Sequence, residues 1–208
     1  MPPFTVLHVC MGNICRSPMA ERLLALAVRE RTATLPVGAP PAGPGLADEL
    51  LHSHSAGTGG WHAGEEMNPP AARQVRARGG TDAGFAARKL RSDQIDGADL
   101  VLTATADQQE YVVALRPDAA PRTFVLGEFG RLLAGVDPAA LPPAGADPES
   151  VYARGVAVVA AAHAVRAEAV ALPTDDLDDP WGRGDHTFTR VADEIEETLR
   201  PFAALLLP

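Results

Sequence analysis

Short apolar runs alternate with stretches of helical periodicity along most of the 208-residue chain. The first run, FTVLHV at residues 4–9, is rich in β-branched residues and is typical of a buried parallel strand. From Ser17 to about Arg31 apolar residues recur at helical spacing, with Ser17 expected as the N-cap and Pro18 as the first helical residue. Further strands are predicted near 50–56, 99–104 and 122–126, and further helices near 68–79, 107–115, 127–134, 150–171 and 187–205.

Strands that alternate with helices predict an α/β fold, a three-layer sandwich with a parallel sheet and helices on both faces. The chain is long enough for one domain with a sizeable core, and we expect a single domain over residues 1–208. Two segments rich in Pro and Gly, near 32–50 and 135–148, lack periodicity and are expected to be loops.

The charge and hydropathy of the chain disfavour two classes of partner. With 27 acidic residues against 18 Lys and Arg, the formal net charge is −9, whereas nucleic-acid phosphates are held by clustered basic side chains. No apolar run approaches the roughly 18 residues that a membrane span needs. The opening MPPFTVLHVC lacks the basic start and the longer apolar core of a signal peptide. We therefore expect a cytoplasmic protein that binds neither nucleic acid nor membrane.

Both cysteines lie in one loop, CMGNICRS at residues 10–17, between the first predicted strand and the first predicted helix. In α/β sheets this position binds anions, because backbone amides and the positive end of the helix dipole converge there. Gly12 allows the tight turn that points amides inward, and Arg16 adds a planar fork suited to two phosphate oxygens. The same field favours the thiolate form of Cys10, a nucleophile aimed at phosphorus, and Ser17 is expected to donate a hydrogen bond to it.

Zinc is a competing interpretation of the cysteines, because His52, His54 and His62 accompany them. The two cysteines lie in an anion loop, however, and no second cysteine pair follows. We therefore expect no metal, and we expect His62 at the rim of a cleft.

CMGNICRSPMAE, which begins at residue 10, resembles the phosphate-binding loop of the low-molecular-weight protein tyrosine phosphatases. HSAGTGGWHAG at 54–64 resembles the family's second strand and following turn, DLVLTA at 99–104 its third strand, and DPW at 179–181 its Asp-Pro-aromatic motif. The resemblance covers most of the chain and implies four parallel strands in the order 2-1-3-4. The segments near 32–50 and 135–148 then become insertions, because they lengthen the chain beyond the usual size of the family.

The resemblance implies hydrolysis of phosphotyrosine in proteins, and of small aryl phosphates, in two steps and without a metal or cofactor. Cys10 attacks phosphorus to form phosphocysteine while Arg16 and the loop amides hold the equatorial oxygens. Asp179 protonates the leaving oxygen and then acts as base for the water that hydrolyses the intermediate. The implied partner is a phosphorylated protein, and we expect a monomer or weak dimer.

The resemblance also implies roles around the phosphate. Asn13 is expected to hold the loop through hydrogen bonds that reach Ser55, whereas Phe85 replaces a loop-supporting histidine of eukaryotic members. Trp61 and Trp181 are expected to flank the departing ring. The residues expected to bind substrate or phosphate are Met11, Gly12, Asn13, Ile14, Cys15, Ser17, Trp61 and Trp181.

Cys15 has two interpretations, a small buried side chain or a resolving thiol. A resolving thiol would capture oxidised Cys10 in a reversible disulfide, and the resemblance favours this redox-regulated form. In the acidic loop before the DPW motif, Asp175, Asp176 and Asp178 are expected on a solvated face.

Three other activities fit the same loop. DPWGRG and TFVLGEFGRLL resemble bacterial branches, one of which removes phosphate from arginine; there we expect a small Thr after the nucleophile, whereas Met11 favours an aryl phosphate. Arsenate reduction coupled to a thiol cofactor remains open, because only the thioredoxin-coupled version needs cysteines beyond Cys15. A non-catalytic phosphate sensor would use the loop without needing Asp179.

Overall fold

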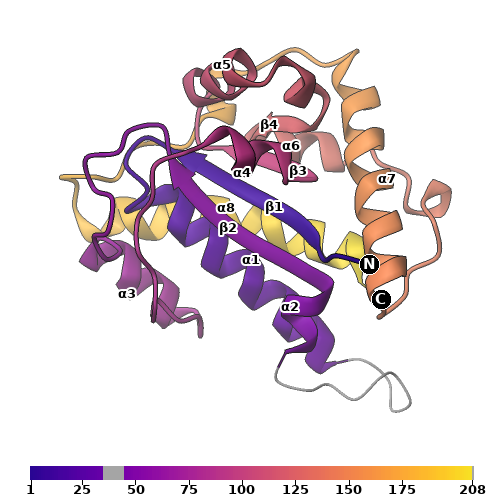
Figure 1. Ribbon diagram of the computed structural model, residues 1–208, viewed down its shortest axis with the longest axis horizontal. Coiled ribbons are helices and arrows are strands. Elements are labelled where there is room, and N and C mark those ends of the chain that lie inside the picture. The colour runs from indigo at the N-terminus through magenta and orange to yellow at the C-terminus, as the bar shows by residue number, and fades with distance from the viewer. Residues whose placement is uncertain (35–44, 208) are drawn as a thin grey trace.

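The computed structural model describes residues 1–34 and 45–207, which form an α/β sandwich (Figure 1). Its strands are β1 (Phe4–Cys10), β2 (Leu51–Gly57), β3 (Leu100–Thr103) and β4 (Thr123–Val125). They are parallel and lie in the order β2-β1-β3-β4, which confirms the predicted order 2-1-3-4. Since β1 is an inner strand and Cys10 is its last residue, the predicted nucleophile stands in the middle of the carboxyl edge.

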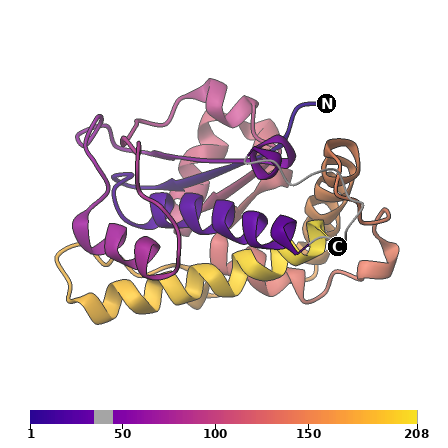
Figure 2. The same cartoon turned by 90° about the horizontal axis from the view of Figure 1, so that it is seen from below.

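Helices cover both faces of this sheet, as predicted. The helices are α1 (Arg16–Ala33), α2 (Leu46–Leu50), α3 (Pro69–Ala77), α4 (Ser92–Asp96), α5 (Ala106–Leu115), α6 (Leu126–Leu133), α7 (Pro148–Arg166) and α8 (Asp185–Leu206), with 3₁₀ turns η1 (Pro117–Arg122), η2 (Pro138–Ala140) and η3 (Pro173–Asp175). Figure 2 shows α1 and the long α8 side by side on one side of the sheet. Side chains alternate across β1, so Val6 joins the core shared with α1 and α8, whereas Leu7 joins a smaller core on the other face with α4 and α5.

The start of α1 differs from the prediction. The helix begins at Arg16, before the expected first residue Pro18, and its N-cap is Cys15 without a side-chain capping bond. Ser17 is therefore wrong as the N-cap: its hydroxyl lies 3.0 Å from the Cys10 sulfur instead of at a free helix amide. Pro18 fits inside the first turn, because the amides of that turn have no intrahelical partner.

The first Pro/Gly-rich segment was expected to be a loop, but its described part is mostly helical, because α1 runs to Ala33 and α2 spans Leu46–Leu50. Residues 35–44 lie outside the described part of the chain, and the remainder of the first segment includes α2, which was not predicted. The second segment holds η2 and ends where α7 begins. Helix α7 stops at Arg166 instead of the predicted 171, and the Val170 carbonyl beyond it accepts a hydrogen bond from the Arg131 guanidinium. Among the described residues, no helix combines the length and apolar composition that a membrane span requires.

Candidate active site

The loop between β1 and α1 holds Cys10 and Arg16 close together in the protein interior. Cys10 is 3% exposed and Arg16 is 5% exposed. Between them, Asn13 is the one non-glycine residue of the described chain with a positive φ, 54°. Asn adopts this left-handed conformation at lower cost than most side chains. The loop therefore turns sharply at Asn13.

The Asn13 side chain connects the loop to three other segments. Its Nδ2 donates to Ser17 Oγ at 2.9 Å and to Ser55 Oγ on β2 at 2.8 Å. Its Oδ1 accepts from the backbone amide of Arg88 at 2.9 Å. Segment 84–90 thus contacts the loop through its backbone, while Phe85 is buried in the core with the Arg22 guanidinium 5.9 Å from its ring centroid.

A buried carboxylate that the sequence interpretation missed completes this network. Ser55 Oγ donates to Glu21 Oε2 at 2.6 Å, and Glu21 is 6% exposed. Burial raises the pKa of Glu21 above its ordinary value, although the Ser55 bond and Arg22 act in the opposite direction. Glu21 follows Ser17 by four positions and shares a helix face with the buried Leu24. A charged residue on that apolar face was the only sign in the sequence that Glu21 is buried.

The end of β2 forms a backbone cradle for the loop. The amides of Thr58 and Gly59 donate to the carbonyls of Cys10 and Met11, each at 2.9 Å. At Gly57 an added Cβ would lie 2.7 Å from the Met11 carbonyl oxygen, so only glycine allows this close approach.

Arg16 joins the loop to the segment before α8. Its Nη1 donates to the Leu177 carbonyl at 3.0 Å, and its Nη2 donates to Asp179 Oδ2 at 3.0 Å. The other carboxylate oxygen of Asp179 accepts from the Trp181 amide at 3.1 Å, and the Asp179 side chain is 51% exposed. The carboxylate thus lies at the surface above a buried guanidinium.

A pocket of about 220 Å³ brings most of the predicted site residues together. Its rim is apolar: Trp61 and Trp181 are each 64% exposed and Met11 is 48% exposed. The residues that line it are Cys10, Met11, Gly12, Ile14, Cys15, Arg16, Trp61, His62, Asp179 and Trp181. Of the predicted set, Asn13, Ser17 and Ser55 lie behind this lining, where they contact the loop from the protein side.

Cys15 lies in the same pocket but in a different electrostatic setting. Its pKa is raised to about 12, first by burial and then by the nearby Cys10 and Asp179. The side chain therefore stays a neutral thiol at physiological pH. Both cysteines are free thiols.

The three histidines of the zinc interpretation do not gather around the cysteines. His52 and His54 stack on β2 with ring centroids 5.1 Å apart, while His62 lines the pocket and pairs with Glu65 at 2.7 Å. Across residues 1–34 and 45–207, no group of three potential metal ligands is found.

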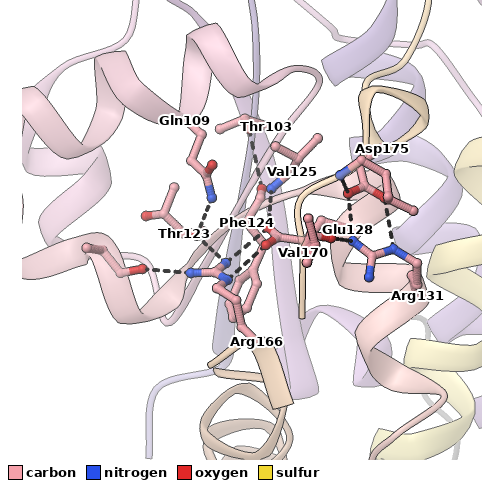
Figure 3. A network of polar contacts seen from close by, with 12 residues as sticks. Thr103, Gln109, Thr123, Phe124, Val125, Glu128, Arg131, Arg166, Val170 and Asp175 are labelled. Carbon is pink, nitrogen blue, oxygen red and sulfur yellow. Dashed lines mark hydrogen bonds and ion pairs between the residues drawn. The ribbon is translucent and has the colours of Figure 1, made fainter. Parts of the chain in front are cut away.

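The acidic loop is less solvated than predicted, and for Asp175 the prediction is wrong. Asp175 is 6% exposed and accepts two hydrogen bonds from Arg131, as Figure 3 shows. Asp176 and Asp178 are exposed, but Asp176 accepts from the Ala106 amide at 2.8 Å and Asp178 pairs with Arg190. The sequence offered only a run of acidic residues, whose partners are far away along the chain.

The fold and this pocket are those of an α/β phosphatase that works through a cysteine. The chain belongs to the low molecular weight phosphotyrosine protein phosphatase family, whose model matches residues 5–135.

Individual relatives agree with this assignment. The chain is 35% identical over 136 residues to a low molecular weight protein-tyrosine-phosphatase of Streptomyces coelicolor, covering 65% of this chain and 71% of the relative. It is 31% identical over 128 residues to a protein-arginine-phosphatase of Geobacillus stearothermophilus, covering 61% and 72%. The solved YwlE arginine phosphatase of Geobacillus stearothermophilus superimposes with a TM-score of 0.61 over 97% of this chain and 92% of that one, at 24% identity, which shows the shared fold.

Proposed function

We propose that this protein hydrolyses phosphotyrosine in proteins, and small aryl phosphates, through a phosphocysteine intermediate. One observation carries the proposal: Cys10 and Arg16 from the loop after β1 and Asp179 from the segment before α8 line a single pocket. The family assignment and the relative named as a tyrosine phosphatase support the same reaction.

In the first step the Cys10 sulfur attacks phosphorus and the bond to the leaving oxygen breaks. The hydrogen bond between Cys10 Sγ and Ser17 Oγ, at 3.0 Å, supports a thiolate as nucleophile and eases its later departure. Ser17 is itself fixed by Asn13, which Ser55 in turn orients. These bonds support a loop that is organised before substrate arrives, so little reorganisation is needed during reaction.

Arg16 holds the equatorial phosphate oxygens together with amides of residues 11–16. A planar guanidinium binds two phosphate oxygens at once, and burial strengthens the attraction. In the free protein the same guanidinium contacts Leu177 and Asp179. Phosphate would therefore compete with Asp179 for one donor of Arg16.

Asp179 gives a proton to the leaving phenolate oxygen and, in the second step, takes a proton from the water that attacks phosphocysteine. Its side chain is half exposed at the mouth of the pocket, a position that supports contact with both a leaving group and water. Trp61, Trp181 and Met11 would surround the departing ring, and their apolar surface supports an aromatic leaving group.

Phosphoarginine in proteins is the second candidate substrate. The observation in its favour is the Geobacillus stearothermophilus relative named as a protein-arginine-phosphatase. Against it stands Met11, whose exposed side chain at the rim offers an aromatic ring apolar contact and offers a guanidinium no hydrogen bond.

Cys15 is proposed as a redox guard. Peroxide oxidises the Cys10 thiolate to sulfenic acid, and the Cys15 thiol then displaces hydroxide, so that a disulfide and water form. Because the raised pKa keeps Cys15 protonated, the two thiols differ in reactivity and Cys10 is oxidised first.

The proposed partner is a phosphorylated protein. A nucleophilic thiol requires a reducing compartment, which supports the cytoplasm as its location. The expectation of a monomer or weak dimer stays a prediction, and sedimentation of the purified protein would check it.

The decisive experiment compares turnover of phosphotyrosine, phosphoarginine and arsenate by the same preparation, with Cys10→Ser as control. We expect fastest turnover of phosphotyrosine, a burst of nitrophenol from para-nitrophenyl phosphate, and a phosphocysteine that can be trapped. Faster turnover of phosphoarginine would support the second candidate, and reduction of arsenate with a thiol cofactor would favour the reductase. Phosphate binding with neither burst nor phosphocysteine would instead identify a sensor.

A further inference from the structure

The segment from the end of α7 to the start of α8 carries Asp179 and is attached to α6 by an ion pair between a partly exposed arginine and a buried aspartate. From this geometry we infer that Arg131 and Asp175 are positioning residues for Asp179, a role that rests on the proposed function. Neither residue lines the pocket around Cys10. Their effect on the reaction must therefore pass through the chain.

Arg131 and Asp175 form a bidentate ion pair. Arg131 Nε donates to Asp175 Oδ1 at 3.1 Å and Nη2 donates to Oδ2 at 2.7 Å (Figure 3). The same Nη2 donates to the Val170 carbonyl at 3.1 Å, and the Leu172 amide donates to Asp175 Oδ2 at 2.9 Å. One guanidinium thus holds the segment at two points, on either side of the turn into η3.

Backbone packing reinforces this attachment. A Cβ at Gly127, in the first turn of α6, would lie 2.5 Å from the Asp175 carbonyl oxygen and 3.0 Å from its Cα. The η3 backbone therefore rests directly on α6, and only glycine leaves room for it. This close approach fixes where along α6 the segment sits.

Helix α6 is in turn fixed to the sheet, so the attachment has a rigid base. Glu128 pairs with Arg166 at 3.1 Å, and the Arg166 guanidinium lies 3.6 Å from the ring centroid of Phe124 on β4. Arg166 also donates to the Thr123 carbonyl at 2.7 Å (Figure 3). The end of α7 and the η3 turn are consequently tied to one platform, α6 with β4.

Beyond Asp175 the chain is guided to the pocket by bonds from other elements. Asp176 accepts from the Ala106 amide at the start of α5, and the Leu177 amide donates to the Ala104 carbonyl at 2.8 Å. Asp179 comes only four residues after Asp175, and its carboxylate accepts fewer hydrogen bonds than that of Asp175. Its carboxylate bonds only to Arg16 and to the nearby Trp181 amide among the described residues.

A shift of the segment at Asp175 would therefore reach Asp179, whereas the Cys10 loop, held by Asn13 and β2, would keep its place. Misplacing a catalytic group by about 1 Å can cost on the order of 10²-fold in rate. The loss should fall on both proton transfers proposed for Asp179. Only the transfer to the leaving group enters kcat/KM, which covers the steps up to departure of that group. Attack by Cys10 and phosphate binding should be affected much less.

The test uses the full chain and two substrates that differ in their need for an acid. Phenyl phosphate releases a phenolate that needs a proton, whereas dinitrophenyl phosphate releases a stable anion. With phenyl phosphate, Arg131→Gln and Asp175→Asn should lower kcat/KM by about 10-fold or more, with dinitrophenyl phosphate by less than about 2-fold. Inhibition by inorganic phosphate should stay within about 2-fold of wild type.

Three comparisons make the result specific. In an Asp179→Asn background, Arg131→Gln should add no further loss with phenyl phosphate, because the group it positions is gone. Arg131→Lys keeps the charge without the fork and should show an intermediate loss, and it serves if a neutral variant fails to fold. Arg116→Gln removes an exposed Arg–Asp pair at Asp96, and both substrates should then react at the wild-type rate.

Equal losses on both substrates in Arg131→Gln, or a loss that persists in the Asp179→Asn background, would overturn the positioning role. If Asp179→Asn itself showed no leaving-group dependence, the general-acid proposal and the positioning role would fall together. These outcomes are distinguishable because the single Asp179→Asn variant is measured in the same series.

Discussion

Arg16 and Asp179 form an ion pair with a separation of 3.0 Å between Nη2 and Oδ2, although 163 positions separate them in the sequence. The guanidinium is buried and the carboxylate is half exposed. A phosphate oxygen that takes the place of Asp179 puts another negative charge beside the buried guanidinium, so the exchange does not leave Arg16 unpaired. The pair thus brings the proposed acid to the phosphate site in a form that substrate can displace.

The first prediction concerns Asp179. Asp179→Asn removes the proton donor and should lower kcat/KM with phenyl phosphate by about 10²- to 10⁴-fold. Because dinitrophenolate leaves without a proton, the loss with dinitrophenyl phosphate should be far smaller. Steady-state kinetics on both substrates measure this, and equal rates for wild type and variant on phenyl phosphate would remove Asp179 from the mechanism.

The second prediction concerns the choice between the two phosphoamino acids. Met11→Thr replaces an apolar side chain at the pocket rim by a small hydroxyl that can face a guanidinium. The ratio of kcat/KM for phosphoarginine to that for phosphotyrosine should rise by about 10-fold. Met11→Leu is the matched control, since it keeps the apolar rim and should leave the ratio as in wild type. A ratio that falls or stays constant in Met11→Thr would show that Met11 does not set this preference.

Oxidation provides the third prediction. After brief peroxide treatment, the wild-type protein should regain most of its activity with dithiothreitol, because a Cys10–Cys15 disulfide protects the nucleophile. Cys15→Ser should regain roughly a tenth or less of its own untreated activity, because sulfenic acid then proceeds to irreversible forms. Mass spectrometry of the treated wild type should find the disulfide, and equal recovery by both proteins would count against a resolving role.

Much of this site could be predicted because most of the residues that carry its chemistry are nearly consecutive in the sequence. The loop from Cys10 to Ser17 contains the turn residue, the arginine and the polar side chains in one stretch, and the strand before it fixes its place on the sheet. The alternation of strands and helices likewise predicted the sheet and its covered faces, and the family resemblance supplied the strand order that the structure confirms.

The residues that were misjudged are those whose partners lie far along the chain. Asp175 belongs to an acidic run, and nothing local indicates that Arg131 reaches it from α6. From the sequence, Glu21 is an ordinary charged residue of a helix, because nothing local shows that Ser55 on β2 donates a hydrogen bond to it. Ser17 is a different case, because its partner Cys10 lies in the same loop. It was expected both to cap α1 and to bond the Cys10 sulfur, and its hydroxyl lies at the sulfur instead of at a helix amide.

Glu21 gives the last prediction, which concerns stability against pH. Because the pKa of Glu21 is raised above its ordinary value of 4.5, the folded state binds this proton more tightly than the unfolded state. Its contribution to stability is therefore fully present below the ordinary pKa and is lost as pH rises through the raised pKa. Glu21→Gln has no proton to lose and keeps an oxygen that can accept from Ser55.

Urea unfolding between about pH 4 and pH 8 measures the effect. As pH rises through this range, the free energy of unfolding of Glu21→Gln should increase relative to wild type, by about 1.4 kcal/mol for each unit by which the pKa is raised. Glu30→Gln, on the exposed side of the same helix, is the control for loss of a helix carboxylate and should run parallel to wild type. If Glu21→Gln also ran parallel to wild type across the range, burial of Glu21 would not be coupled to its protonation, and the carboxylate would have to be held ionised by Arg22 and Arg88.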